Sequence, residues 1–347
     1  MSEHNRPRAI AHGRDEKEAR LVAPARYFPP RSGRYQVNVG LARLGSDFGN
    51  GEADAKALQI DRSWPRYRRE KARRRRSALA AHVGTCGAEA AIRAAAVAVL
   101  ARRLAAEHPA RFRLDPSRGG CALVCRLSGE RLDFDPAWNL RRLTGFHARV
   151  SGEPPYRDAL DALACQVQED LALVRVDPDG SDRLVYLHVC FPAHWDPAAK
   201  LGGDFATVHA PVPDFARIAA RSAPLLRHLV EGGDMVRFIW GLAGDRRLSH
   251  HPAFPAPCGP PSTGLRLWLR VERQVTLGLP QAGGFLFLIR TYLRPVTTLQ
   301  PEEREALAAA VADMSEEALA YKGYGGQREA LITALRAPPH LSTPGGT

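Results

Sequence analysis

Several patterns that would assign a function directly are missing from this 347-residue chain. It has no apolar run of eighteen residues, and residues 1–20 are too charged to form a secretion signal. Glycine-rich phosphate-binding motifs, the GxSxG nucleophile motif and the HExxH zinc motif are also missing. These absences argue against a membrane span, a nucleotide cradle, an elbow-type hydrolase and a zinc peptidase. We therefore expect a cytoplasmic protein without these activities.

Cysteine is scarce, and its spacing is uninformative. None of the six cysteines forms a CxxC pair, and most lie in apolar surroundings: Cys86, Cys121, Cys125, Cys165, Cys190 and Cys258. Paired motifs are typical of zinc and iron–sulfur sites, so the chain is not expected to hold either group. We predict buried, reduced thiols.

Positive charge is abundant and unevenly distributed. The net charge is +12, and nine basic residues fall between Arg62 and Arg76 against one acid, Glu70. Such a block favours an anionic partner. Nucleic acid is an unlikely partner, because the few nearby aromatic residues form no stacking platform and no nucleic-acid-binding motif occurs elsewhere. An acidic protein partner and a simply solvated helix face both stay open.

The chain has enough apolar residues, 45%, to bury a substantial core. We expect flexible tails at 1–26 and 337–347 around one domain at 27–336. The pattern predicts helices from Arg66 to His82 and from Glu89 to His108, and a helical stripe from Leu160 to Val174. Two or three short helices follow Pro301.

Strand patterns dominate the remainder. Three short candidates follow Pro109, and four longer ones begin near residues 183, 234, 265 and 283. The last two are separated by a linker short enough to join antiparallel neighbours. The fold class expected is α+β: an antiparallel sheet flanked by helices, with an N-terminal helical lead-in and C-terminal helices.

One loop-rich stretch, "HVCFPAHWDPAAKLGGDFATVHAPVP", raises the question of a bound group. It contains His188, His194 and His209 together with four prolines. A structural loop needs glycine and proline for its turns but has no need of imidazoles. Haem needs only one strong protein ligand, an apolar slot and partners for its propionates, and so leaves little trace in a sequence.

This stretch, extended to "VYLHVCFPAHWDPAAKLGGDFATVHAPVP", has ordered companions in "VQEDLALVR", "RVERQVTLGLP" and "FLFLIRTYLRP". Together these blocks resemble the haem-dependent oxidative N-demethylase α-subunit family, which includes dimethylamine monooxygenase subunits. The resemblance covers roughly Tyr27 to Pro295. It implies a PAS-like fold that binds haem b and an oxygen-dependent demethylation of a small secondary amine. Electrons would come from NADPH through a separate reductase that carries FMN and a 2Fe–2S cluster. An acidic surface of this reductase could dock near Arg62 to Arg76.

Carried over position by position, the resemblance implies that His209 is the axial iron ligand. A proline-flanked segment fixes an imidazole with little freedom to lose. His188 and His194 are weaker alternatives, and His209 could instead only hydrogen-bond a loop carbonyl.

The same motifs suggest further site residues. The candidates for the propionates are Lys200, Arg273 and Arg290, each of which could equally form a structural ion pair. Gln274 and Tyr292 could supply polar groups on the oxygen side, and Glu169 or Asp170 could hold the amine.

The chain departs from the family pattern at two places. Ile239 stands where an asparagine is expected, and Val275 to Pro280 lacks two expected arginines, with Gly278 in this segment. Haem affinity or substrate choice could differ as a result. A haem-based gas or redox sensor, and a structural or nucleic-acid-associated protein, are the competing hypotheses.

Overall fold

The computed structural model describes residues 21–37, 39–213, 215–255 and 267–337. Most of the two predicted tails, residues 1–20 and 338–347, lies outside the described residues, as does Cys258. Within residues 21–26, the Val22 carbonyl accepts a hydrogen bond from the Arg62 backbone, and the Arg26 backbone donates to Asn50.

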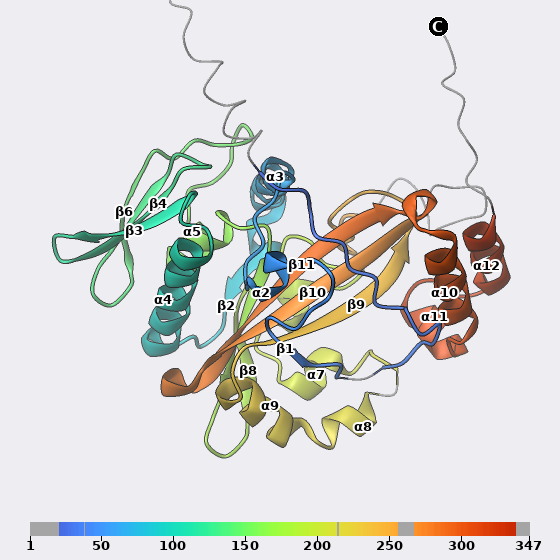
Figure 1. Ribbon diagram of the computed structural model, residues 1–347. Coiled ribbons are helices and arrows are strands. Elements are labelled where there is room, and N and C mark those ends of the chain that lie inside the picture. The colour runs from blue at the N-terminus through green and yellow to red at the C-terminus, as the bar shows by residue number, and fades with distance from the viewer. Residues whose placement is uncertain (1–20, 38, 214, 256–266, 338–347) are drawn as a thin grey trace, which may run out of the picture.

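A seven-stranded antiparallel sheet forms the centre of the molecule (Figure 1). Its strands, in spatial order, are β1 (Ala42–Arg43), β9 (Met235–Ala243), β10 (Trp268–Leu279), β11 (Gly284–Pro295), β7 (Asp170–Val176), β8 (Asp182–His188) and β2 (Val83–Thr85). The long β10 and β11 are joined by a short 3-10 turn, Pro280–Ala282. Gly283 closes this turn in the left-handed region, with φ 62°, which glycine adopts at no steric cost. The predicted antiparallel pairing of these two strands is confirmed.

A second, four-stranded sheet projects from one end (Figure 1). It contains β3 (Phe112–Ser117), β4 (Gly120–Cys125), β5 (Arg131–Phe134) and β6 (Leu140–Thr144). The sequence predicted three of these strands but only one sheet. The separation follows from α4 (Ala90–Glu107), which packs between the two sheets and covers the inner side of each.

The two helices predicted before residue 109 lie where the sequence placed them. Helix α2 (Glu52–Ala55) precedes α3 (Trp64–His82), which has Pro65 in its first turn, and α4. The predicted stripe from Leu160 to Val174 is wrong in its second half. Helix α5 ends at Ala164 (Ala159–Ala164), and the later residues form β7. A buried strand is apolar on both faces, so a short apolar run does not distinguish it from a buried helix.

Four short helices follow β8: α6 (Pro197–Lys200), which contacts α3, and α7 (Phe205–His209), α8 (Ala216–Ala219) and α9 (Ser222–Glu231), which lie below the sheet in Figure 1. The chain then ends in α10 (Pro301–Ala312), α11 (Glu316–Tyr321) and α12 (Arg328–Arg336), as predicted. These C-terminal helices pack on the far end of β10 and β11 in a separate apolar cluster.

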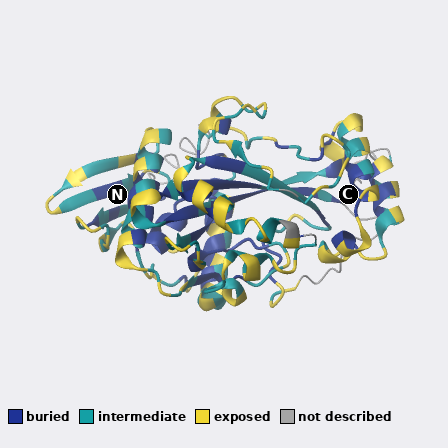
Figure 2. Ribbon diagram, turned by 90° about the horizontal axis from the view of Figure 1, so that it is seen from below, coloured by how far each residue is buried: buried dark blue, intermediate teal, exposed yellow. Residues whose placement is uncertain are grey.

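Burial is concentrated in the sheet strands, while the helices expose their outer sides (Figure 2). The largest apolar cluster joins the central strands to α4, α5 and the four-stranded sheet. Among the described residues, no helix is long and apolar enough to cross a bilayer. The architecture is mixed helix and antiparallel sheet, which confirms the α+β class.

Candidate functional site

Different segments of the chain pack on the two faces of the seven-stranded sheet. Side chains alternate along a strand, and the register places Arg237, Glu272 and Gln274 on one side. This side packs toward the short helices α7 and α9, and we call it the α7 face. The opposite side carries Arg273 and Arg290 and is crossed by residues 54–61; we call it the N-terminal face.

His209 ends helix α7 on the α7 face. The helix starts at Asp204, whose carboxylate accepts a hydrogen bond from the Thr207 backbone at 2.7 Å. The imidazole Nδ1 lies 2.8 Å from the Phe205 carbonyl oxygen. Because a carbonyl only accepts, Nδ1 carries the proton, and the lone pair of a neutral ring is then on Nε2. Nε2 forms no hydrogen bond to any residue that the structure describes.

The surroundings of His209 keep its ring neutral. The rings of Phe205 and Phe215 pack against it at centroid distances of 4.5 and 5.0 Å. Burial lowers the pKa of His209 to about 4, opposed by the hydrogen bond to Phe205, and the charges of Arg237 and Lys200 lower it further. A neutral imidazole with a free Nε2 is the form that binds a metal.

A cleft of about 660 Å³ adjoins this segment. One wall is the chain from Ala210 to Pro213, directly after His209, and the other comes from α11 and includes Tyr321. The cleft is open to solvent, and its lining residues follow His209 in the chain without including it.

Two further predicted residues, Lys200 and Gln274, share this side of the sheet. Burial lowers the pKa of Lys200, and its ammonium has no partner among the described residues. Gln274 accepts a hydrogen bond from Arg237 Nε at 2.8 Å and donates to Glu272 at 3.2 Å. The structure therefore brings His209, Lys200 and Gln274 to one face.

Arg273 lies on the N-terminal face, where main-chain oxygens satisfy it. Its guanidinium donates to the carbonyls of Asp54, Lys56 and Ala57 at 2.8–3.3 Å.

Arg290 and Tyr292 belong to the same face. Arg290 forms an ion pair with Asp61 at 2.7 Å and stacks on Tyr67 and Tyr292, 4.0 and 4.8 Å from the ring centroids. The Tyr292 hydroxyl donates to Gln59, and burial raises its pKa well above the usual value. The sheet thus lies between these side chains and His209.

The two predicted carboxylates, Glu169 and Asp170, are buried. Glu169 accepts from the Gln59 backbone at 2.9 Å, and burial raises its pKa. Asp170 accepts from the backbones of Cys190 and Phe191 at 3.0 and 2.7 Å, and burial raises its pKa to about 6. Both act as acceptors for main-chain groups that would otherwise be unpaired in the core.

The basic segment predicted as one surface is divided between surface and core. Three of its cations, Arg68, Lys71 and Arg75, point inward from α3 and are buried. The exposed arginines are Arg62, Arg66, Arg69, Arg73 and Arg76, which recur every three or four residues along one side of α3 and which we call the arginine stripe. The interpretation of the whole block as a solvated or docking face is therefore wrong for the three inward cations.

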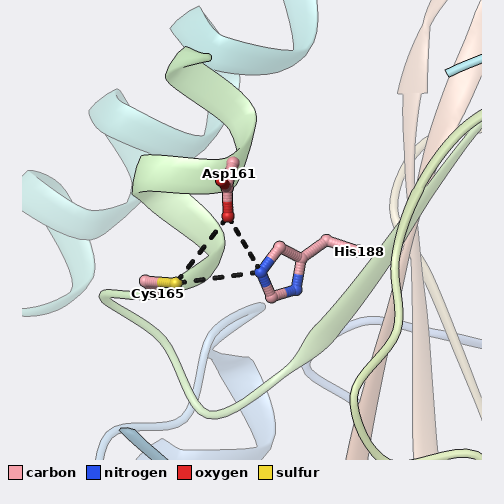
Figure 3. A group of neighbouring side chains, drawn as sticks. All are labelled: Asp161, Cys165 and His188. Atoms are coloured by element: carbon pink, nitrogen blue, oxygen red, sulfur yellow. Dashed lines mark hydrogen bonds and ion pairs between the residues drawn. The ribbon is translucent and has the colours of Figure 1, made fainter. Parts of the chain in front are cut away.

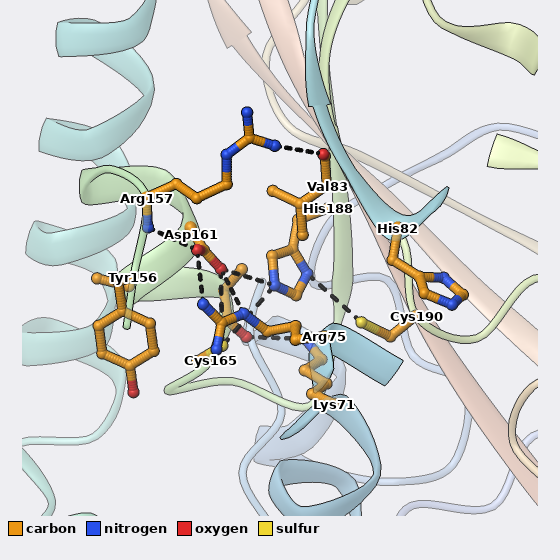
Figure 4. Close-up of polar contacts among 12 residues, drawn as sticks. Lys71, Arg75, His82, Val83, Tyr156, Arg157, Asp161, Cys165, His188 and Cys190 are labelled. Carbon is orange, nitrogen blue, oxygen red and sulfur yellow. Dashed lines mark hydrogen bonds and ion pairs between the residues drawn. The ribbon is translucent and has the colours of Figure 1, made fainter. Parts of the chain in front are cut away.

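The inward cations form a charge network with acids from α5 and the preceding loop (Figure 4). Arg75 makes a two-pronged pair with Asp161, at 2.9 and 2.8 Å, and reaches Glu153 at 3.2 Å. Arg68 pairs with Glu153 at 2.7 Å. The sequence signal was present, because positions 68, 71 and 75 lie on one side of a helix, but nothing local indicated which acids would meet them.

His188 joins this network together with two thiols (Figures 3 and 4). Its Nε2 lies 3.2 Å from Asp161 and 3.7 Å from Cys165, and its Nδ1 lies 3.9 Å from Cys190. Burial raises the pKa of Cys165 to about 12 and lowers that of His188, so the thiol is protonated and the ring neutral.

The ligand atoms of Asp161, Cys165 and His188 are close enough to share a cation. However, Arg75 already neutralises Asp161, and the Lys71 ammonium lies in the same network. An entering cation would meet two buried positive charges, so we assign the cluster a structural role. His194, the other alternative ligand, stacks on His250 at 5.1 Å.

The two departures noted in the sequence differ in their surroundings. Ile239 pairs with Glu272 across the α7 face. Gly278 lies under the end of α9, where an added Cβ would be 2.3 Å from the Val230 carbonyl oxygen. An arginine at position 278 would therefore require α9 to move.

The fold and site define an α+β protein that presents a neutral imidazole directly before a segment lining an open cleft. A family model described as haem-dependent oxidative N-demethylase, alpha subunit-like, matches residues 51–332. The chain belongs to this family, which confirms the resemblance drawn from its sequence. A search of curated proteins found no match.

Proposed function

We propose that this chain is the haem-binding subunit of an enzyme that oxidatively removes a methyl group from a small secondary amine. The observation that carries the proposal is His209, whose Nδ1 is committed to a carbonyl while its Nε2 has no partner among the described residues. Membership of a haem-dependent demethylase family supports the cofactor and the reaction type. In this proposal the sheet and helices α6–α9 form the PAS-like haem module.

The residues present fit haem b. His209 would hold the iron, and the aromatic rings of Phe205 and Phe215 would keep its imidazole oriented. Lys200 and Gln274 would serve the polar edge of the ligand. When bound, haem supplies the activation of dioxygen, with electrons from outside the chain. The overall reaction consumes the amine, dioxygen, two electrons and two protons and yields formaldehyde, the demethylated amine and water.

We propose a supporting role for the other predicted residues. Arg273, Arg290, Tyr292, Glu169 and Asp170 bond within the protein and would fix the sheet behind the ligand. Their effect on the reaction would come through position, because a buried, satisfied network holds its neighbours rigidly.

The spectrum of purified protein tests this function. Protein from haem-supplied cells should show a Soret band, and His209→Ala should lose or shift it, with partial rescue by added imidazole. His194→Ala is the matched control and should leave the band unchanged. A His209→Ala spectrum identical to that of the wild type would refute the ligand assignment. Haem binding without amine-dependent NADPH consumption, in the presence of a competent reductase, would favour the sensor hypothesis.

We propose that the partner reductase, carrying FMN and a 2Fe–2S cluster and oxidising NADPH, docks an acidic surface on the arginine stripe. Exposed charges of one sign steer such encounters. Because α3 and α7 lie on opposite sides of the sheet (Figure 1), the stripe would recruit the partner and would not itself carry electrons.

Charge reversal tests the docking proposal. Arg69→Glu/Arg73→Glu should slow reduction about tenfold at low salt, and the difference should vanish at high salt. Arg118→Glu, at an exposed turn of the four-stranded sheet, is the control. Equal rates for both variants at low salt would exclude the stripe as the docking surface.

A further inference from the structure

One half-buried cation on the α7 face was not among the sequence-based candidates. Arg237 belongs to β9 and shares this face with Gln274, to which its Nε donates at 2.8 Å. Its two terminal nitrogens form no hydrogen bond or ion pair with any residue that the structure describes. A guanidinium has five donors, so this half-buried side chain, held at one end by Gln274, keeps donors that a ligand on this face could take.

The neighbouring acid does not account for Arg237. Glu272 is the nearest carboxylate on this face, but its oxygens accept from Arg270, at 3.2 and 3.3 Å, and from Gln274. It forms no ion pair with Arg237 within 4.0 Å. Burial lowers the pKa of Arg237, and Glu272 only partly opposes this shift.

The other cations of the protein interior are treated differently. Arg75 and Arg290 each meet a carboxylate within 3 Å, and Arg273 meets three carbonyls. Arg237 differs from them in being only half-buried, with neither terminal nitrogen bonded to a described residue; among the fully buried arginines, Arg290 leaves one terminal nitrogen, Nη1, without a partner. Its charge also lowers the pKa of His209, on the same face.

We propose that Arg237, oriented by Gln274, is the carboxylate-binding residue of the α7 face and pairs with a propionate of the bound haem. This inference rests on the haem binding proposed above and adds the residue that recognises the acidic edge of the porphyrin. A planar guanidinium with two free terminal nitrogens can bind a carboxylate in a two-pronged manner. Lys200 offers only a point charge on a less buried side chain.

Haemin and haemin dimethyl ester separate this role from general packing, because esterification removes the propionate charges and leaves the ring. Apo-protein is titrated with each compound and followed at the Soret band. Arg237→Met should bind haemin about 10- to 100-fold more weakly than the wild type and bind the ester with unchanged affinity. Arg237→Lys, which keeps the charge and the long side chain, should lie between them. Arg227→Met, an exposed arginine of α9, is the matched control and should bind both compounds as the wild type does.

Two outcomes would overturn the inference: wild-type haemin affinity in folded Arg237→Met and Arg237→Lys, or equal losses of affinity for haemin and for the ester.

A separate experiment uses succinate, a small carboxylate, with the melting temperature as readout. If the wild type binds neither porphyrin, the proposed function fails. The carboxylate site then stands only if succinate raises the melting temperature of the wild type and not of Arg237→Met, and it is overturned if succinate stabilises neither.

Discussion

Replacing Arg75 by methionine tests whether the inward cations of α3 hold the protein together. Arg75 is fully buried and donates to Asp161 through two nitrogens, to Glu153 and to the carbonyls of Pro154 and Pro155. Methionine keeps most of the volume and removes the charge. Asp161 and Glu153 would then be buried with less compensation, which typically costs about 3–5 kcal/mol.

The expected change in melting temperature follows from the length of the chain. Unfolding entropy near 2.1 cal/mol/K per residue gives about 0.7 kcal/mol/K here, so the melting temperature should fall by roughly 4–7 °C. Arg73→Met is the control, because Arg73 is exposed and only pairs with Glu70 at 3.3 Å. Its cost should be about 0–0.5 kcal/mol, a shift below roughly 1 °C.

Lowering the pH should reduce the difference in the free energy of unfolding between the wild type and Arg75→Met. Burial alone would raise the pKa of Asp161, but the hydrogen bond with His188 and the pairing with Arg75 outweigh it and hold the pKa below its usual value. A depressed carboxyl pKa stabilises the fold above the unfolded pKa of about 3.9, and the contribution is lost as the pH falls toward the folded pKa. Urea unfolding at pH 7 and pH 3 measures this. Equal destabilisation by Arg75→Met and Arg73→Met at pH 7 would refute the network as a source of stability.

Three further predictions concern burial. Burial lowers the pKa of His82 from 6.5 to about 4, so the stability that its neutral form contributes is present above pH 6.5 and is lost as the pH falls to 4. His82→Leu should remove up to about 3 kcal/mol of this pH dependence, measured by urea unfolding between pH 7 and pH 4. An unchanged dependence of the unfolding free energy on pH would contradict this prediction. Gly278→Ala should cost about 1–3 kcal/mol of stability, because the added Cβ would crowd the Val230 carbonyl. Gly323 has open space around it but a φ of 77°, so Gly323→Ala should cost about 1 kcal/mol from backbone strain alone. Equal urea midpoints for the two variants would argue against crowding at Gly278. Cys125, Cys165 and Cys190 should be inert to a thiol reagent until the protein unfolds, in contrast to half-buried Cys86, and their rapid labelling in native protein would contradict the burial.

The sequence predicted elements best where a local rule was sufficient. Pro65 and the apolar spacing that follows it placed α3 correctly, and the short linker around Pro280 implied the β10–β11 hairpin. It predicted less well where tertiary contacts decide. Leu171 and Val174 fit a helical stripe, yet they belong to β7, because pairing with β11 and β8 satisfies their backbones in the core.

The candidate site shows the same division. His209 was predicted as a ligand from the family resemblance, and the structure adds that its Nδ1 is committed to a carbonyl. Strand alternation alone could not place Arg273 and Arg290 relative to His209, because a strand has two faces and the sequence does not say which one the N-terminal segment covers. Arg237 was passed over for the same reason.

By itself the sequence determined the family, the α+β class, the absence of the common nucleotide and zinc motifs, and the concentration of positive charge before residue 77, because each of these depends on residue identity and short-range spacing. Only the tertiary structure decided which of those charges are exposed, which acids neutralise the buried ones, and which polar side chains share a face with His209. Charges in a core need partners at contact distance, and in this fold the partners of Arg75 and Arg290 come from residues 78 to 229 positions away, a separation that no local pattern records.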